Sequence, residues 1–255
     1  APENDPLGRE VGEFMISARG RTQEQWDAIK AGSTQRTWSA LYQQRPAPAE
    51  GAVWQSPWIE AFRKRTGDHP TGFARTVVSV DPAAKAKATS DYTGIIVTAI
   101  DHSGQAWVLD DKTLRGTPVE WGTAVWAAVF EWEATDVVVE DNQGGDMVVE
   151  VLRSAWTTLK NPARLAPPIR RVTATQSKRT RAEAVAALYE TGKVHHAADN
   201  TGRLDKLETQ MLAWTGDGKS PDRIDALVHG ITWLFKNNTG ESMQQKRHRW
   251  SHIRR

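Results

Sequence analysis

The sequence contains no cysteine, which excludes disulfides, thiolate metal sites and a cysteine nucleophile. It also lacks a run of about 18 apolar residues that could span a bilayer. The first residues show neither the basic nor the apolar region of a secretory signal peptide. These absences predict a soluble intracellular protein without a membrane partner. Its 255 residues, of which 39% are hydrophobic, are enough to bury a core.

Acidic residues are missing from one long stretch and from the carboxyl-terminal tail. There is no Asp or Glu between Glu150 and Glu183 or within residues 244–255. The first stretch carries basic residues instead: Arg153, Lys160, Arg164, Arg170, Arg171, Lys178, Arg179 and Arg181. Cations separated from the acids in this way could hold a nucleic-acid backbone, or they could be solubilising surface charge.

Two Val-rich runs end in an acidic residue. The run 76–80 is followed by Asp81 and then by a proline, and the run 137–139 is followed by Glu140. Continuous β-branched runs are typical of buried strands. A carboxylate at the carboxyl end of such a strand lies at the rim where α/β proteins keep their sites. An aspartate before proline is also a common turn residue, so the two runs together carry more weight than either alone.

From residue 75 onward, the pattern alternates between strands and helices. Strands are expected at 76–80, 94–100, 106–110, 137–140 and 169–172, with extended backbone at 194–196. Helices are expected at 120–132, 147–156, 181–189, 204–214 and 221–235. The last helix is predicted to start with Ser220 as its N-cap and Pro221 at its first position. A three-strand meander, a helix and then a parallel strand predict a mixed α/β sheet covered by helices on both faces.

The remaining segments are less regular. Residues 1–70 contain scattered proline and glycine and, apart from a helix expected over 22–31, no strong periodic face. We interpret them as an arm or connector, residues 71–240 as the folded domain, and residues 241–255 as a basic tail.

A helix laid across the end of the sheet would bring Asp225 to the same rim as Asp81 and Glu140. Oxygen ligands without cysteine or an ordered set of histidines favour hard ions such as Mg²⁺ or Mn²⁺. Two such ions, about 3.5 to 4 Å apart, can activate water and stabilise the leaving oxygen in phosphodiester hydrolysis. In this interpretation Asp81 bridges the ions, Glu140 holds one and Asp225 holds the other.

Other residues are weaker candidates. Four acids near the first three are secondary candidate ligands, although helix caps or solvated charges are the simpler interpretation: Asp91, Asp141, Asp146 and Asp222. Residues 213–220 resemble a loosened phosphate loop, but they follow an expected helix instead of a strand. His195 and His196 are adjacent on extended backbone, so their side chains point to opposite faces and at most one could serve a site.

Several stretches, taken in order, resemble the nuclease domain of the large terminase subunits of tailed bacteriophages. They are residues 80–82, 90–94, 139–142 and 220–227, with further similarity at 5–9, 38–46 and 207–211. The resemblance implies a ribonuclease H-like fold and a metal-dependent endonuclease that cuts concatemeric viral DNA, with Asp81, Glu140 and Asp225 as metal ligands.

The same resemblance implies partners and a location. Double-stranded DNA would be the substrate. A packaging ATPase domain of the same full-length protein, the small terminase subunit and a portal ring would be partners. The protein would act in the host cytoplasm and would not be a structural part of the virion. Because the sequence offers no acceptable phosphate loop, residues 1–70 would be the end of the ATPase domain and the connector, and ATP hydrolysis is not expected of this chain alone.

Five basic residues are predicted to contact DNA phosphates: Arg170, Arg171, Lys178, Arg179 and Arg181. Sequence-specific binding is not expected, because the chain has no recognised base-reading motif. Two alternatives remain open. One is a junction-resolvase-like nuclease of the same fold, which would prefer branched DNA. The other is a non-cleaving module that holds DNA or docks to the portal and keeps vestigial acids.

Overall fold

The computed structural model describes residues 20–31, 51–64, 68, 70, 72–82, 92–141, 145–159, 165–197, 201–218 and 220–238. The chain divides into two compact units, Ala1–Ala47 and Pro48–Arg255. In the first unit, helix α1 spans Gln23–Ala31, which confirms the helix expected there. None of the helices in the described ranges is both long and apolar enough to cross a membrane.

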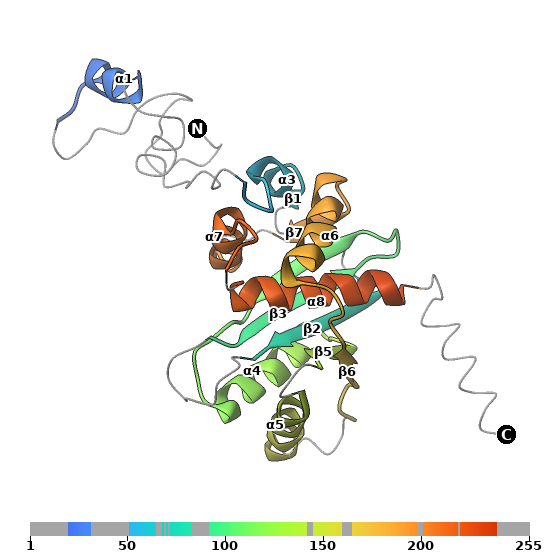
Figure 1. Cartoon of the computed structure of the whole chain (residues 1–255). Helices are drawn as coiled ribbons and strands as arrows, with labels where there is room; N and C mark the ends of the chain where they lie inside the picture. The colour runs from blue at the N-terminus through green and yellow to red at the C-terminus, as the bar shows by residue number, and fades with distance from the viewer. Residues whose placement is uncertain are drawn as a thin grey trace. The chain divides into compact units, whose positions relative to one another are not determined.

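The second unit is built on a seven-stranded mixed sheet (Figure 1). In spatial order the strands are β1 (Arg63–Lys64), β7 (Val194–Ala197), β4 (Ala106–Asp111), β3 (Gly94–Ile100), β2 (Arg75–Asp81), β5 (Asp136–Glu140) and β6 (Ile169–Val172). Strands β2, β3 and β4 form an antiparallel meander, and the other neighbours pair in parallel. This confirms the predicted mixed sheet. The Val- and Ile-rich runs of β2 and β3 are buried along almost their whole length, as expected for central strands covered on both faces.

Helices α4 (Pro118–Glu131) and α5 (Gly145–Thr158) cover one face of the sheet (Figure 1). A capping box starts α4: the Thr117 hydroxyl accepts the N–H of Glu120, while the Glu120 carboxylate accepts the N–H of Thr117. Trp126 in α4 is fully buried, and its Nε1 donates to the backbone oxygen of Leu152 in α5 at 2.8 Å. This hydrogen bond ties the two helices to each other inside the core.

Helices α3 (Ser56–Glu60), α6 (Lys178–Glu190), α7 (Asp205–Ala213) and α8 (Asp222–Asn237) lie on the opposite face (Figure 1). Helix α8 lies directly on β2 and β3, because two glycines make room for it. A Cβ on Gly94 would lie 2.1 Å from the backbone oxygen of Asp222, and one on Gly230 would lie 2.7 Å from the hydroxyl oxygen of Ser79. Helix α8, which carries Asp225, therefore packs closely against β2, the strand that ends in Asp81.

Residues 51–64 join this second unit. Trp54 is fully buried, with its ring centroid 6.4 Å from that of Tyr189 and 6.2 Å from that of Trp214. The N–H of Val53 donates to the backbone oxygen of Trp214 at 3.1 Å, and β1 extends the sheet beside β7. The sheet unit therefore takes in residues that the sequence analysis grouped with the arm. The assignment of residues 1–70 to an ATPase end and connector stays a prediction.

Candidate metal centre

Two neighbouring parallel strands bring Asp81 and Glu140 together. Val80 pairs with Val139 across β2 and β5, so the next residues, Asp81 and Glu140, lie side by side at the carboxyl end. Side chains alternate between the two faces of a sheet. Ser79, two residues before Asp81, faces α8, and Asp81 therefore lies on the face that α8 covers. Glu140 lies on that same face, as its neighbour in register.

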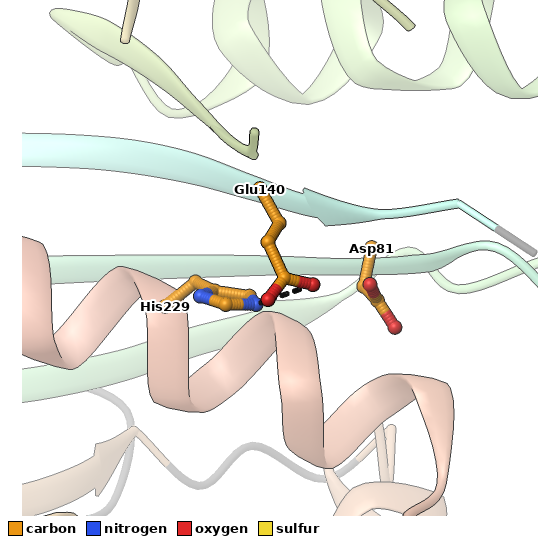
Figure 2. A group of neighbouring side chains, drawn as sticks. All are labelled: Asp81, Glu140 and His229. Atoms are coloured by element: carbon orange, nitrogen blue, oxygen red, sulfur yellow. Dashed lines mark ion pairs between the residues drawn. The ribbon is translucent and has the colours of Figure 1, made fainter. Parts of the chain in front are cut away.

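Helix α8 contributes two more side chains to this rim. Asp225 and His229 are four residues apart, which places them on the same side of the helix, and both are buried. One ligand atom each from Asp81, Glu140 and His229 lie within 4.8 Å of one another. Figure 2 shows these three side chains near one another, with Glu140 directly beside His229. His229 Nε2 lies 3.5 Å from Glu140 Oε2.

The Asp81 carboxyl lies in a crowded acidic environment. Burial raises the pKa of Asp81 well above its ordinary value, and the charges of Asp225, Glu140 and Asp222 raise it further, while Lys178 opposes the shift. Carboxylates packed this closely repel one another unless they share a cation or take up a proton. A divalent cation would relieve this repulsion, so the electrostatics of the rim fit a metal centre.

Two basic residues of α6 face the same acids. The Lys178 ammonium donates to Asp225 Oδ2, and Arg181 Nη1 lies 3.4 Å from Glu140 Oε1. Burial alone would raise the pKa of Glu140, but the hydrogen bond and charge of His229 and the charges of Arg181 and Lys178 bring it below its ordinary value. Glu140 is therefore held as a carboxylate at neutral pH and is available to bind a cation.

Ser220 does not cap α8, so that prediction was wrong. Pro221 takes the N-cap position in an extended conformation, with φ −64° and ψ 140°, and α8 begins at Asp222. Ser220 therefore lies one residue before the cap. Its hydroxyl donates instead to Asp225 Oδ2 at 2.5 Å. The residue expected to start the helix thus orients a carboxylate of the site.

The structure brings together the three acids singled out in the sequence, Asp81, Glu140 and Asp225, and adds His229 to them. The role of these residues as metal ligands stays a prediction. The sequence analysis missed His229, although its spacing of four residues from Asp225 on one helix would have placed it on the same face.

The secondary candidates lie in three different settings. Asp222 opens α8 and interacts electrostatically with Asp81. Asp141 and Asp146 both accept hydrogen bonds from Arg171, at 3.0 and 2.6 Å. Asp91 lies outside the described residues. Of the three secondary acids that the structure describes, Asp222 is therefore the one with an electrostatic interaction with Asp81.

The basic residues predicted to contact phosphates have acidic partners within the chain. Arg170 Nε bonds the buried Asp136 at 2.7 Å. Arg179 pairs with Glu183 at 2.8 Å and with Asp217 at 3.1 Å, and all three side chains are exposed. Exposed ion pairs are weak, so Arg179 can exchange its partners for a phosphate at little cost. Contact between these basic residues and DNA stays a prediction.

The motifs that the sequence analysis set aside are structural. His196 is buried, with Nε2 at 2.9 Å from the Tyr189 hydroxyl and Nδ1 at 2.8 Å from Glu208 Oε1. His195 stacks on Trp107, with ring centroids 4.6 Å apart. The adjacent imidazoles therefore point apart, as predicted. The stretch that resembles a phosphate loop follows helix α7 and not a strand, as predicted.

A three-strand meander extended by parallel strands, with helices on both faces and acids at the ends of two central strands, defines a ribonuclease H-like domain. Comparison with known families then narrows this class. The family model described as the terminase RNaseH-like domain matches residues 78–233, more than half of the chain, and the chain belongs to this family. The matched range contains all four residues of the candidate centre.

Solved structures share the fold at low sequence identity. The large terminase of a thermophilic bacteriophage matches at TM-score 0.51 and 10% identity over 85% of this chain, which spans about half, 53%, of that protein. The human cytomegalovirus terminase nuclease domain matches at TM-score 0.49 and 12% identity over 73% of this chain and 96% of that one. The nuclease domain of the large terminase subunit gp2 of bacterial virus Sf6 matches at TM-score 0.48 and 14% identity over 69% and 96%. No curated protein sequence gives a significant match.

Proposed function

We propose that this chain is a divalent-metal-dependent endonuclease that hydrolyses phosphodiester bonds of double-stranded DNA, as the nuclease part of a viral DNA-packaging terminase. The proposal is supported by the convergence of Asp81, Glu140, Asp225 and His229 at one rim of the sheet. It is also supported by membership of the terminase RNaseH-like family.

The donor set fits Mg²⁺ or Mn²⁺. Carboxylate oxygens suit both ions, and an imidazole nitrogen is a better ligand for Mn²⁺ than for Mg²⁺. Asp81, Glu140 and His229 would hold one ion, and Asp81 and Asp225 would hold a second. Such ions, when bound, neutralise charge on the reacting phosphate and lower the pKa of the attacking water.

The surrounding residues orient these donors. The Ser220 hydroxyl fixes one oxygen of Asp225. Glu140 is placed between Arg181 and His229, which approach different oxygens of its carboxylate, and the Arg181 side chain is only 12% exposed. Ligands held by fixed neighbours keep their geometry when a cation arrives. The centre is therefore largely preformed before any ion or DNA binds.

The proposal includes the partners expected of this family. The chain would act on concatemeric viral DNA in the host cytoplasm, together with a packaging ATPase domain of the same full-length protein, the small terminase subunit and a portal ring. Family membership supports this part of the proposal.

Plasmid cleavage tests the proposal. Wild type is expected to cut supercoiled DNA with Mg²⁺ or Mn²⁺ and not with EDTA. Removal of a residue that only supports a metal ligand typically reduces activity about 10–100-fold. Asp81→Asn should reduce activity by more than this, and its circular dichroism spectrum should be the same as that of wild type. Asp205→Asn is a matched control, since this exposed aspartate lies in the first turn of α7, and it should retain activity.

Four outcomes would contradict the proposal. Cleavage in EDTA, or full activity in Asp81→Asn, would exclude a metal centre at Asp81. A strong preference for branched over linear DNA would favour the junction-resolvase alternative. DNA binding without cleavage in either metal would favour a module that does not cut.

A further inference from the structure

Lys178 lies among the carboxylates of the centre. It is the first residue of α6, which Ser177 caps by accepting the N–H of Thr180 at 3.1 Å. The Lys178 ammonium donates to Asp225 Oδ2 and also interacts electrostatically with Asp81 and Glu140. One positive charge therefore interacts with three carboxylates, which lie on α8, β2 and β5.

The two cations of α6 that face the acids, Lys178 and Arg181, differ in their freedom to move. The Lys178 side chain is 46% exposed, whereas that of its partner Asp225 is 5% exposed. The lysine can turn into solvent on its flexible four-carbon stem, but the buried aspartate cannot follow it. Arg181, one turn further along α6, is 12% exposed and remains beside Glu140 and His229. Helix α6 therefore presents one fixed cation and one movable cation to the acids.

We propose that Lys178 is a tethered counterion that occupies the Asp225 side of the centre and must leave before a divalent ion binds there. This inference rests on the proposed function. Lys178 and Ser220 share the same Asp225 oxygen, so an ion that takes this oxygen competes directly with the ammonium group. Asp81, Glu140 and His229 can still hold one ion while Lys178 is in place.

DNA changes this competition. A phosphate close to the centre offers the released ammonium an alternative anion and so lowers the cost of leaving Asp225. Binding events that share one residue are coupled, and the coupling is reciprocal. DNA is therefore expected to raise the affinity of the Asp225 side for a divalent ion, and that ion is expected to raise the affinity for DNA. The centre would be completed when substrate arrives, which would restrain cleavage in its absence.

Calorimetric titration of the full chain with Mn²⁺, without DNA, tests the competition. In Lys178→Gln, binding of a second Mn²⁺ is expected to be at least about tenfold tighter than in wild type, because an unscreened carboxylate replaces an ion pair. Lys206→Gln is the matched control, since this lysine is exposed on α7, and it should titrate like wild type. Equal or weaker Mn²⁺ binding by Lys178→Gln would overturn the inference, because Lys178 would then only position Asp225.

A second measurement uses the wild-type chain and does not depend on how a variant folds. Lysines are acetylated briefly with acetic anhydride, and peptide mass spectrometry gives the extent of labelling. Saturating Mg²⁺ is expected to increase labelling of Lys178 relative to the exposed Lys206. Labelling of Lys178 that Mg²⁺ leaves unchanged would overturn the inference.

The two proposals fail in different ways. A wild-type chain that binds no Mn²⁺ would refute the proposed function itself. One bound Mn²⁺, with no effect of Lys178→Gln, would refute the tethered counterion and leave the nuclease centre in place.

Discussion

Replacement of Gly94 tests whether the close approach of α8 to the sheet sets the geometry of the candidate metal centre. Gly94 pairs with Asp81 across β3 and β2. A Cβ at this position would lie 2.1 Å from the backbone oxygen of Asp222 and 2.6 Å from its carbonyl carbon. Non-bonded heavy atoms pack at about 3.5 Å, so Gly94→Ala must move the start of α8, or β3, by about 1 Å.

The cost should be large because the obstacle is backbone, which no change of rotamer can relieve. Overpacking costs about 1–3 kcal/mol and occasionally more, and a contact this short belongs at the upper end. For a chain of this size, about 3 kcal/mol corresponds to a fall in Tm of about 6–12 °C. A shift of about 1 Å between Asp225 and Asp81 should also weaken Mn²⁺ binding, since displacements of this size can cost about 100-fold in catalytic sites.

Urea unfolding followed by tryptophan fluorescence measures the free energy of unfolding, and calorimetry measures the Mn²⁺ affinity. Gly72→Ala is the control, because a Cβ there meets no described atom within 4 Å. It should leave both quantities near their wild-type values. If Gly94→Ala behaves like Gly72→Ala in both assays, the glycine contact does not set the position of α8 and the reasoning is refuted.

Two further predictions concern stability. Thr117→Ala removes the N-cap of α4 and should lower the free energy of unfolding by about 1 kcal/mol; an unchanged urea midpoint would contradict the role of the capping box. Burial would raise the pKa of Glu208, but the hydrogen bond and charge of His196 and the charge of Arg63 hold it below its ordinary value. As the pH falls, Glu208 is therefore protonated at a higher pH in the unfolded chain than in the folded chain. The ion pair contributes its full stability above the unfolded-state pKa of about 4.3 and loses it as the pH falls further. The difference in the free energy of unfolding between wild type and Glu208→Gln should shrink as the pH falls below about pH 4; a difference independent of pH in this range would argue against the ion pair.

Sequence patterns predicted the elements of the sheet well because its central strands are buried on both faces. Continuous Val and Ile runs at β2, β3 and β5 have few other interpretations, and each ends close to the predicted residue. The meeting of Asp81 and Glu140 was also predictable, because acids at the ends of neighbouring parallel strands share one rim.

The partners of the basic residues could not be predicted. Lys178 meets Asp225 across 47 residues of sequence, and Arg181 meets Glu140 from a different element. These contacts depend on how α6 packs over the end of the sheet, and no local spacing encodes that. The contact of the acid-free stretch with DNA phosphates stays a prediction, and nothing in the sequence indicated that two of its cations pair with acids of the candidate centre. The Ser220 prediction failed for a local reason, since a proline can occupy the N-cap as well as the first helical position.

The last strand of the sheet also affects how the chain behaves at high concentration. β6 has only four residues, and its two central positions are Arg170 and Arg171. A strand at the end of a sheet offers unpaired backbone groups to other chains, and short, charged edge strands discourage such pairing. Ion pairs with Asp136 and Asp141 hold the two arginines along this edge. Copies of the chain at high concentration should therefore resist edge-to-edge aggregation.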